Sequence, residues 1–214
     1  MYFMLAAAVE RFAYLKYGLS LVLVLIGAKI IWNFGLSKEL GWAPYLEPHW
    51  ALMMTLALIG GAMAYTFLKA LGKKVGASRT EQDRLAAGKR TLDLAAKLHA
   101  ELLLPVDHIC STQFAERSGD IHVFDGDIKD GYMGLDIGPK TQTKYAMAIA
   151  KAKTVVWNGP MGVFEWMPFR VGTNQVAKAI AEATANGATS IVGGGDSAAA
   201  VEKFGLADKI GRAH

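Results

Sequence analysis

The sequence is poor in features that several classes of protein require. Its 214 residues include a single cysteine, Cys110, which excludes an internal disulfide and fits a reducing compartment. The 23 lysines and arginines are dispersed rather than clustered with aromatic residues, and the net charge is only +4, so no nucleic-acid partner is expected. No basic region precedes the apolar start at Met1, and we therefore expect no secretory signal.

Apolar residues, by contrast, are in excess, and most of that excess lies in the first quarter. Residues 18–28 carry no charge, and from Pro48 to Leu68 no residue carries a fixed charge. Aromatic residues lie between or beside the two runs, as in the interfacial belt of a membrane protein: Trp32, Trp42, Tyr45 and Trp50. The pattern indicates a helical hairpin in a membrane, although a span needs about 20 residues and the first run is shorter. A pair of buried helices in a soluble protein fits the composition equally well.

From Leu56 onward, short apolar runs alternate with helical patterns, which is typical of βαβ units and a mainly parallel sheet. The polar, glycine-rich residues 120–131 are expected to form a surface excursion. The predicted strands are 56–59, 102–105, 134–137, 154–157 and 189–192. The predicted helices are 63–71, 78–100 (with Ser78 or Thr80 as the cap), 140–150, 173–185 and 197–203.

The turn within IVGGGDSAAA, residues 191–200, carries the strongest chemical signal. Glycines let the backbone approach a ligand, and the N–H groups at a helix start attract phosphate. Asp196 would repel a phosphate unless a divalent cation lay between them, so Mg²⁺ bridging Asp196 to a nucleotide phosphate resolves the conflict. The alternative is a flexible turn followed by a helix that Asp196 caps. No lysine follows the glycines, so this is not a Walker A loop.

Two further turns join a predicted strand to a helix. In VVWNGPMGVFE, residues 155–165, the chain turns at Asn158 and ends in Glu165, whose carboxylate suits ribose hydroxyls. An ordinary loop with an exposed acid explains this turn equally well. In LIGGAMAYTF, Gly60 and Gly61 are weak evidence alone, because any tight turn would use them.

Together these segments closely resemble the C-terminal, nucleotide-binding lobe of the phosphoglycerate kinase family. The resemblance covers about residues 58–210 and rests on IGGAMAYTFLKALG, AELLLPVDH, GYMGLDIGPKT, AKTVVWNGPMGVFE, GTNQVAKAIAEA and GATSIVGGGDSAAAVEKFGLADKI. It implies a partial Rossmann-like, three-layer α/β domain, preceded by the α-helical, membrane-type hairpin. It also implies reversible, Mg²⁺-dependent phosphoryl transfer between ATP and 3-phosphoglycerate in the cytoplasm.

The resemblance assigns nucleotide contacts residue by residue. Gly60 and Gly61 would line the adenine side, with Gly134 and Leu135 beside them. Glu165 would hold the ribose, and Asp196 would meet the metal. The remaining contacts would be Asn158, Pro160 and Val163 along the nucleotide, and Gly194, Gly195 and Ser197 at the phosphates.

Parts of the family pattern have no counterpart in this sequence. The phosphoglycerate-binding lobe, the first strands of the nucleotide lobe with their lysine, and the last glycine-rich helix start do not match; Lys29, in IGAKI, is a superficial likeness. We therefore expect a fragment that binds ATP or ADP but does not turn over alone. It would act on 3-phosphoglycerate only if the lobe were supplied.

Residues 1–57 resemble the TerC family of integral membrane proteins, through ERF-x-YLKYGL-x-LVLV. That resemblance implies membrane association of this segment, and residues 58–214 then form the second part. The alternatives to a kinase fragment are a TerC-like membrane fragment with an incidental extension, or a junction of two genes with no joint function.

Overall fold

The computed structural model describes residues 57–58, 60–97 and 100–211. The chain divides into two compact units, Met1–Ala51 and Leu52–His214, and the described residues all belong to the second. The predicted membrane hairpin therefore lies outside the described residues. None of the helices in the described part of the chain is both long and apolar enough to cross a bilayer.

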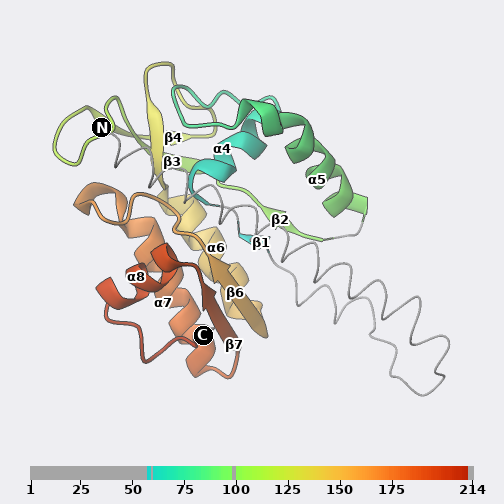
Figure 1. Ribbon diagram of the computed structural model, residues 1–214, viewed down its shortest axis with the longest axis vertical. Helices are drawn as coiled ribbons and strands as arrows, with labels where there is room; N and C mark the ends of the chain where they lie inside the picture. Colours follow the sequence, from blue (N-terminus) through green and yellow to red (C-terminus); the bar gives the residue numbers. More distant parts are fainter. Residues whose placement is uncertain (1–56, 59, 98–99, 212–214) are drawn as a thin grey trace. The chain divides into compact units, whose positions relative to one another are not determined.

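Strands and helices alternate along most of the described chain (Figure 1). The strands are β1 (Ala57–Leu58), β2 (Leu102–Leu103), β3 (Asp107–Ser111), β4 (Ile121–Asp125), β5 (Met133–Ile137), β6 (Thr154–Asn158) and β7 (Thr189–Gly193). The helices are α4 (Gly61–Ala70), α5 (Leu85–Lys97), α6 (Pro139–Lys151), α7 (Val171–Ala185) and α8 (Gly195–Lys203), with short 3₁₀ turns η2 (Gln82–Arg84) and η3 (Met167–Phe169).

The last part of the uncharged run is strand, turn and helix of this unit. β1 ends at Leu58, and α4 begins at Gly61 and buries Ala64, Tyr65, Phe67 and Leu68. The prediction that the second half of this run contains a strand and a turn is confirmed.

The expectation of a mainly parallel sheet is wrong for the described residues. β1 pairs with β2, and β6 with β7, both parallel; β3 lies between β4 and β5 and is antiparallel to both. The segment expected as a surface excursion thus contains strand β4. Sequence pattern misses this sheet because β3 buries polar side chains such as Asp107 and Ser111, while β4 exposes Ile121 and Val123, at 44% and 49%.

The predicted helix over residues 78–100 is shorter than expected. Its first residues are irregular, and regular helix begins only at Leu85, after η2. Ser78 is not a helix cap, because its hydroxyl accepts a hydrogen bond from the N–H of Gly134, at 2.9 Å. The buried Ser78 instead fastens this segment to the strand β5.

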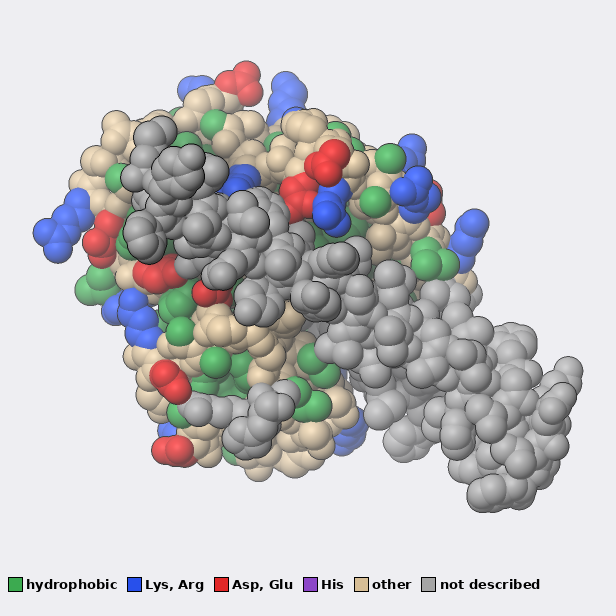
Figure 2. Space-filling model, viewed as in Figure 1, with side chains coloured by type: hydrophobic (Ala, Val, Ile, Leu, Met, Phe, Trp, Pro, Cys, Tyr) green, Lys and Arg blue, Asp and Glu red, His purple; other side chains and the backbone are tan. Residues whose placement is uncertain are grey.

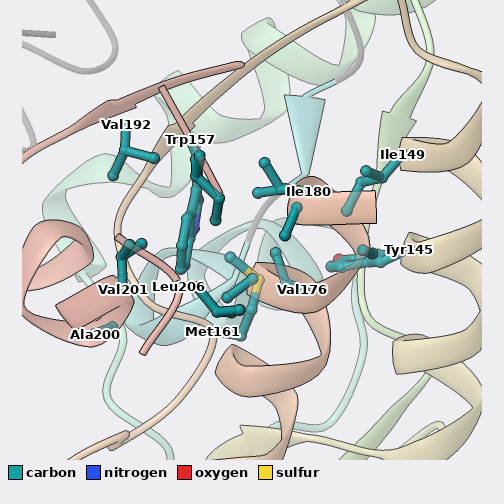
Figure 3. Close-up of a cluster of buried hydrophobic side chains, with 14 of the residues drawn as sticks. Tyr145, Ile149, Trp157, Met161, Val176, Ile180, Val192, Ala200, Val201 and Leu206 are labelled. Carbon is teal, nitrogen blue, oxygen red and sulfur yellow. The ribbon is translucent and has the colours of Figure 1, made fainter. Parts of the chain in front are cut away.

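The largest hydrophobic cluster lies between the β6–β7 pair and helices α6, α7 and α8. Figure 3 shows Trp157 of β6 and Met161 of the following loop among side chains from α7 and α8, including Val176 and Val201. Alanines at buried positions of α7 allow close packing against α6. The loop after β6 is therefore part of the core rather than a loose connection.

A buried aspartate on β3 fixes the start of α6. Asp107 accepts hydrogen bonds from the N–H groups of Lys140 and Thr141, at 2.9 and 2.8 Å, and from the Thr141 hydroxyl, at 2.6 Å. Gly138, the residue at the N-cap, has no side chain to do this. The carboxylate supplies acceptors where the helix itself has none, and its charge suits the positive end of the helix dipole.

Replacing Asp107 by alanine should destabilise the chain. Two backbone donors and a hydroxyl would lose a buried charged acceptor, which should lower the free energy of unfolding by about 2 kcal/mol or more. Urea unfolding of the full chain measures this. Asp125→Ala is the control, since Asp125 pairs with Lys140 in an exposed ion pair and its loss should barely move the midpoint. Equal shifts for both variants would contradict the capping role.

Candidate functional site

The three glycine-containing turns predicted from the sequence meet at the middle one, the loop that follows β6. The N–H of Gly61 donates to the carbonyl of Met161, at 3.0 Å. On the other side, the N–H of Gly159 donates to the hydroxyl of Ser197, at 2.6 Å. Residues separated by about a hundred positions in the sequence thus form one site, at the carboxyl ends of β1, β6 and β7.

The contact between the first and middle turns requires glycine. A Cβ on Gly60 would stand 2.6 Å from the sulfur of Met161 and 2.9 Å from its Cα. Gly61 adopts a left-handed backbone, with φ of 60°, and a Cβ there would stand 3.3 Å from the carbonyl oxygen of Pro160. In the sequence alone this glycine pair is weak evidence, because the close approach of the loop after β6 is not visible there.

The contact between the middle and third turns involves Gly194 and Asn158. Gly194 has φ of 84°, and a Cβ on it would stand 2.5 Å from the Asn158 side-chain oxygen. Gly194 is the N-cap of α8, so Asp196 lies within the first turn of that helix rather than at its cap. The interpretation of Asp196 as a capping residue is therefore wrong. Ser197 is fully buried, and its hydroxyl ties the two turns together.

Space remains open around the start of α8. Apart from the adjoining residues and the backbone of α8 itself, no described atom lies within 4 Å of where a Cβ would stand on Gly193 or Gly195, and Gly195 is exposed. The N–H groups of Gly195, Asp196 and Ser197 lie in the first turn, where the helix itself provides no acceptor. This geometry suits an anion such as a phosphate.

Leu135 and Val163, both predicted nucleotide contacts, are joined directly. The N–H of Val163 donates to the carbonyl of Leu135, at 2.9 Å. Gly134 is beside them, but the space where its Cβ would stand is filled by the buried Tyr65 of α4. Any ligand contact of Gly134 would therefore involve its backbone rather than that space.

Glu165 lies on the exposed part of the β6–α7 connection. Its backbone carbonyl accepts a hydrogen bond from the Lys203 ammonium, at 2.9 Å, and that ammonium lies 5.7 Å from the centre of the Phe164 ring. Phe164 itself is buried. The last turn of α8 thus holds the segment that presents Glu165.

Two buried residues that sequence reasoning did not select hold this loop in place. The hydroxyl of Thr173, at the start of α7, accepts hydrogen bonds from the N–H groups of Met161 and Gly162, at 3.1 and 3.3 Å. Asp136 of β5 is 1% exposed, and burial raises the pKa of its carboxyl to about 7, against the effect of two backbone N–H donors. Both residues lie in segments that the sequence assigned to a strand and a helix, where their packing is not visible.

The described residues suit a metal ion that is held mainly by the phosphates of a bound molecule, with few protein side chains. No group of three or more histidine, cysteine, aspartate or glutamate side chains in the described ranges is arranged to hold a metal ion. Mg²⁺ commonly binds through one or two carboxylates and substrate phosphates while keeping several waters. Asp196, partly exposed beside the open start of α8, suits that mode of binding.

Charged side chains show no large patch of one sign on the visible face of the described residues. Figure 2 shows lysines and arginines scattered among acidic groups, with apolar side chains between them.

The family model described as phosphoglycerate kinase matches residues 52–212. The chain belongs to the phosphoglycerate kinase family. Among curated relatives, the phosphoglycerate kinase of Thermosipho africanus is 54% identical over 155 residues, which are 72% of this chain and 38% of that protein. The cytosolic phosphoglycerate kinase of Trypanosoma congolense is 51% identical over 154 residues, 72% of this chain and 37% of that protein.

Solved phosphoglycerate kinases share the fold. The enzyme of Coxiella burnetii matches with a TM-score of 0.70 and 40% identity, over 73% of this chain and 40% of that one. The enzyme of Pyrococcus horikoshii matches with a TM-score of 0.60 and 29% identity, over 78% of this chain and 41% of that one. The chain thus spans about two fifths of the length of these phosphoglycerate kinases. The family match begins at residue 52, slightly before the boundary predicted at 58.

Gly194→Ala should destabilise the chain far more than Gly193→Ala. Alanine at 194 would adopt a left-handed backbone and press on Asn158, which should cost about 1–3 kcal/mol in unfolding free energy. At Gly193, with no such φ and no described atom within 4 Å of a Cβ, we expect a small effect. Urea unfolding of both variants measures the difference. Equal costs would show that the third turn does not have this geometry.

Proposed function

We propose that the described unit binds the Mg²⁺ complex of ADP or ATP. The observation that carries the proposal is the convergence of three strand-to-helix turns on the loop after β6, beside the open start of α8. Membership of the phosphoglycerate kinase family supports nucleotide as the ligand. The reaction proposed for the complete enzyme is reversible phosphoryl transfer between ATP and 3-phosphoglycerate, a step of glycolysis in the cytoplasm.

Each predicted residue has a proposed role in this complex. The first turn, Gly60 and Gly61, lines the adenine side together with Gly134 and Leu135. Glu165 accepts hydrogen bonds from ribose hydroxyls, and Asp196 binds Mg²⁺. The rest of the set comprises Asn158, Pro160 and Val163 along the nucleotide, and Gly194, Gly195 and Ser197 around the phosphates.

Phosphoryl transfer depends mainly on positioning and on stabilising the charge of the transferred group. Mg²⁺, when bound, would neutralise part of the phosphate charge. In this proposal the described residues position the nucleotide. The start of α8 offers N–H donors to the phosphates, and the loop after β6, held by the Thr173 hydroxyl, forms one side of the binding site. The phosphoglycerate end would come from the rest of a complete kinase, because this chain matches about two fifths of its relatives.

Asp196→Ala should weaken binding of Mg·ADP to the full chain by at least about tenfold, or about 1.4 kcal/mol, through loss of a metal ligand. Isothermal titration calorimetry, with and without Mg²⁺, measures this. Asp208→Ala is the matched control, since Asp208 is an exposed acid beyond the end of α8. Wild-type chain that does not bind Mg·ADP would overturn the nucleotide proposal. Equal affinity of Asp196→Ala and wild type would remove Asp196 from the metal site.

A second proposal concerns residues 1–56, the part of the predicted segment 1–57 that precedes β1, where apolar runs flanked by tryptophan and tyrosine favour a TerC-like membrane segment. Under this proposal the kinase part stays in the cytoplasm and is associated with the membrane through its N-terminal segment.

Cells expressing the full chain should retain it in carbonate-washed membranes, since an inserted apolar hairpin resists extraction that releases peripheral proteins. A chain that begins at Leu52 is the control and should remain in the supernatant. Full chain released by carbonate would contradict membrane insertion.

A further inference from the structure

Asp136 occupies a central place among the elements that surround the β6 loop. It lies on β5, next to Leu135, whose carbonyl accepts the N–H of Val163. Its carboxylate is buried, and its hydrogen bonds go to the start of α7 and to its own strand. Any influence on a bound nucleotide must therefore pass through other residues.

The carboxylate caps α7 from outside that helix. One oxygen accepts the N–H of Gly172 at 2.7 Å, and the other accepts the N–H of Ile137 at 2.9 Å. Arg170, the N-cap residue of α7, makes no side-chain capping bond. Asp136 therefore supplies an acceptor that the first turn of α7 lacks.

The next residue of α7 carries the connection to the loop. Thr173 follows Gly172 directly, and its hydroxyl accepts the N–H groups of both Met161 and Gly162. The loop backbone also passes closely over the carboxylate: a Cβ on Gly162 would stand 2.5 Å from an Asp136 oxygen and 2.7 Å from the Asp136 Cα. One carboxylate thus sets both the start of α7 and the space in which the loop lies.

We propose that Asp136 is a positioning residue for the nucleotide loop, residues 158–164. By fixing Gly172 it orients the Thr173 hydroxyl toward Met161 and Gly162, and this places Pro160 and Val163 against the nucleotide. The effect on nucleotide affinity rests on the proposed function. The effect on the loop itself does not, and is measured without any ligand.

Asp136→Asn in the full chain is the direct test. Asparagine has the same shape but replaces one acceptor oxygen by an N–H₂ donor, so Gly172 or Ile137 faces a donor instead of an acceptor. Amide hydrogen exchange of residues 159–166, without nucleotide, should accelerate by at least about tenfold, and the Kd for Mg·ADP should rise by a similar factor.

Asp107→Asn is the matched control, because Asp107 is another buried aspartate that caps a helix start, that of α6. It should lower global stability without selective acceleration in residues 159–166, and without a rise in Kd when fully folded. Loop exchange that rises equally in both variants would show that Asp136 acts only on overall stability, and would overturn the proposal.

Substitutions of Thr173 test the connection from α7 to the loop without altering the Asp136 carboxylate. They also test the proposal if Asp136→Asn does not fold. Thr173→Val removes the acceptor and should reproduce the faster loop exchange and weaker binding, while Thr173→Ser keeps the hydroxyl and should restore both. Unchanged amide hydrogen exchange of residues 159–166 in Thr173→Val would overturn the proposal that Asp136 acts on the loop through Thr173. If wild-type chain does not bind Mg·ADP but the exchange differences appear, the nucleotide proposal fails while the positioning role stands.

Discussion

The arrangement of the site depends on how the backbone N–H groups of the loop after β6 are satisfied. This loop has no regular structure of its own, yet residues 159–164 are all buried or half-buried, so their backbone donors need acceptors from elsewhere. Gly159 donates to Ser197 of α8, Met161 and Gly162 to Thr173 of α7, and Val163 to Leu135 of β5. Three elements thus define the loop conformation, and the loop in turn defines where the other two turns lie.

Two kinds of glycine make this arrangement possible. Gly60 and Gly162 allow backbone segments to approach to within contact distance, and any Cβ there would overlap a neighbour. Gly194 provides a left-handed turn that leads from β7 into α8. The site is therefore formed mostly by main chain, and side chains such as Ser197 and Thr173 serve to hold it. A main-chain site of this kind tolerates few substitutions at its glycines but does not need many charged residues.

The sequence was sufficient for most of the fold that surrounds the site. Helices α4, α6, α7 and α8 and strands β5, β6 and β7 all lie where apolar patterns and glycine turns predicted them, within a few residues. The antiparallel strands β3 and β4 were missed, because polar residues of β3 are buried by partners that are distant in sequence, such as Thr141 for Asp107. The same limit explains why Asp136 and Thr173 were not selected. Their importance comes from hydrogen bonds across 36 and 12 positions, and local sequence does not encode these.

The distance in sequence between loop and anchors also has a consequence for how the site forms during synthesis. The bond from Gly159 to Ser197 closes a separation of 38 residues, and the packing of Met161 requires α7 and α8. Contacts of such range close long loops, and the entropic cost of closing them must be overcome before the contacts stabilise the chain. On a ribosome, β6 and its loop emerge after Leu135 of β5 but before Thr173 of α7 and Ser197 of α8, so only one of the three acceptors is present when the loop appears. Any ligand that requires all three turns together would bind only after α8 has packed, and would stabilise the finished state rather than direct its formation.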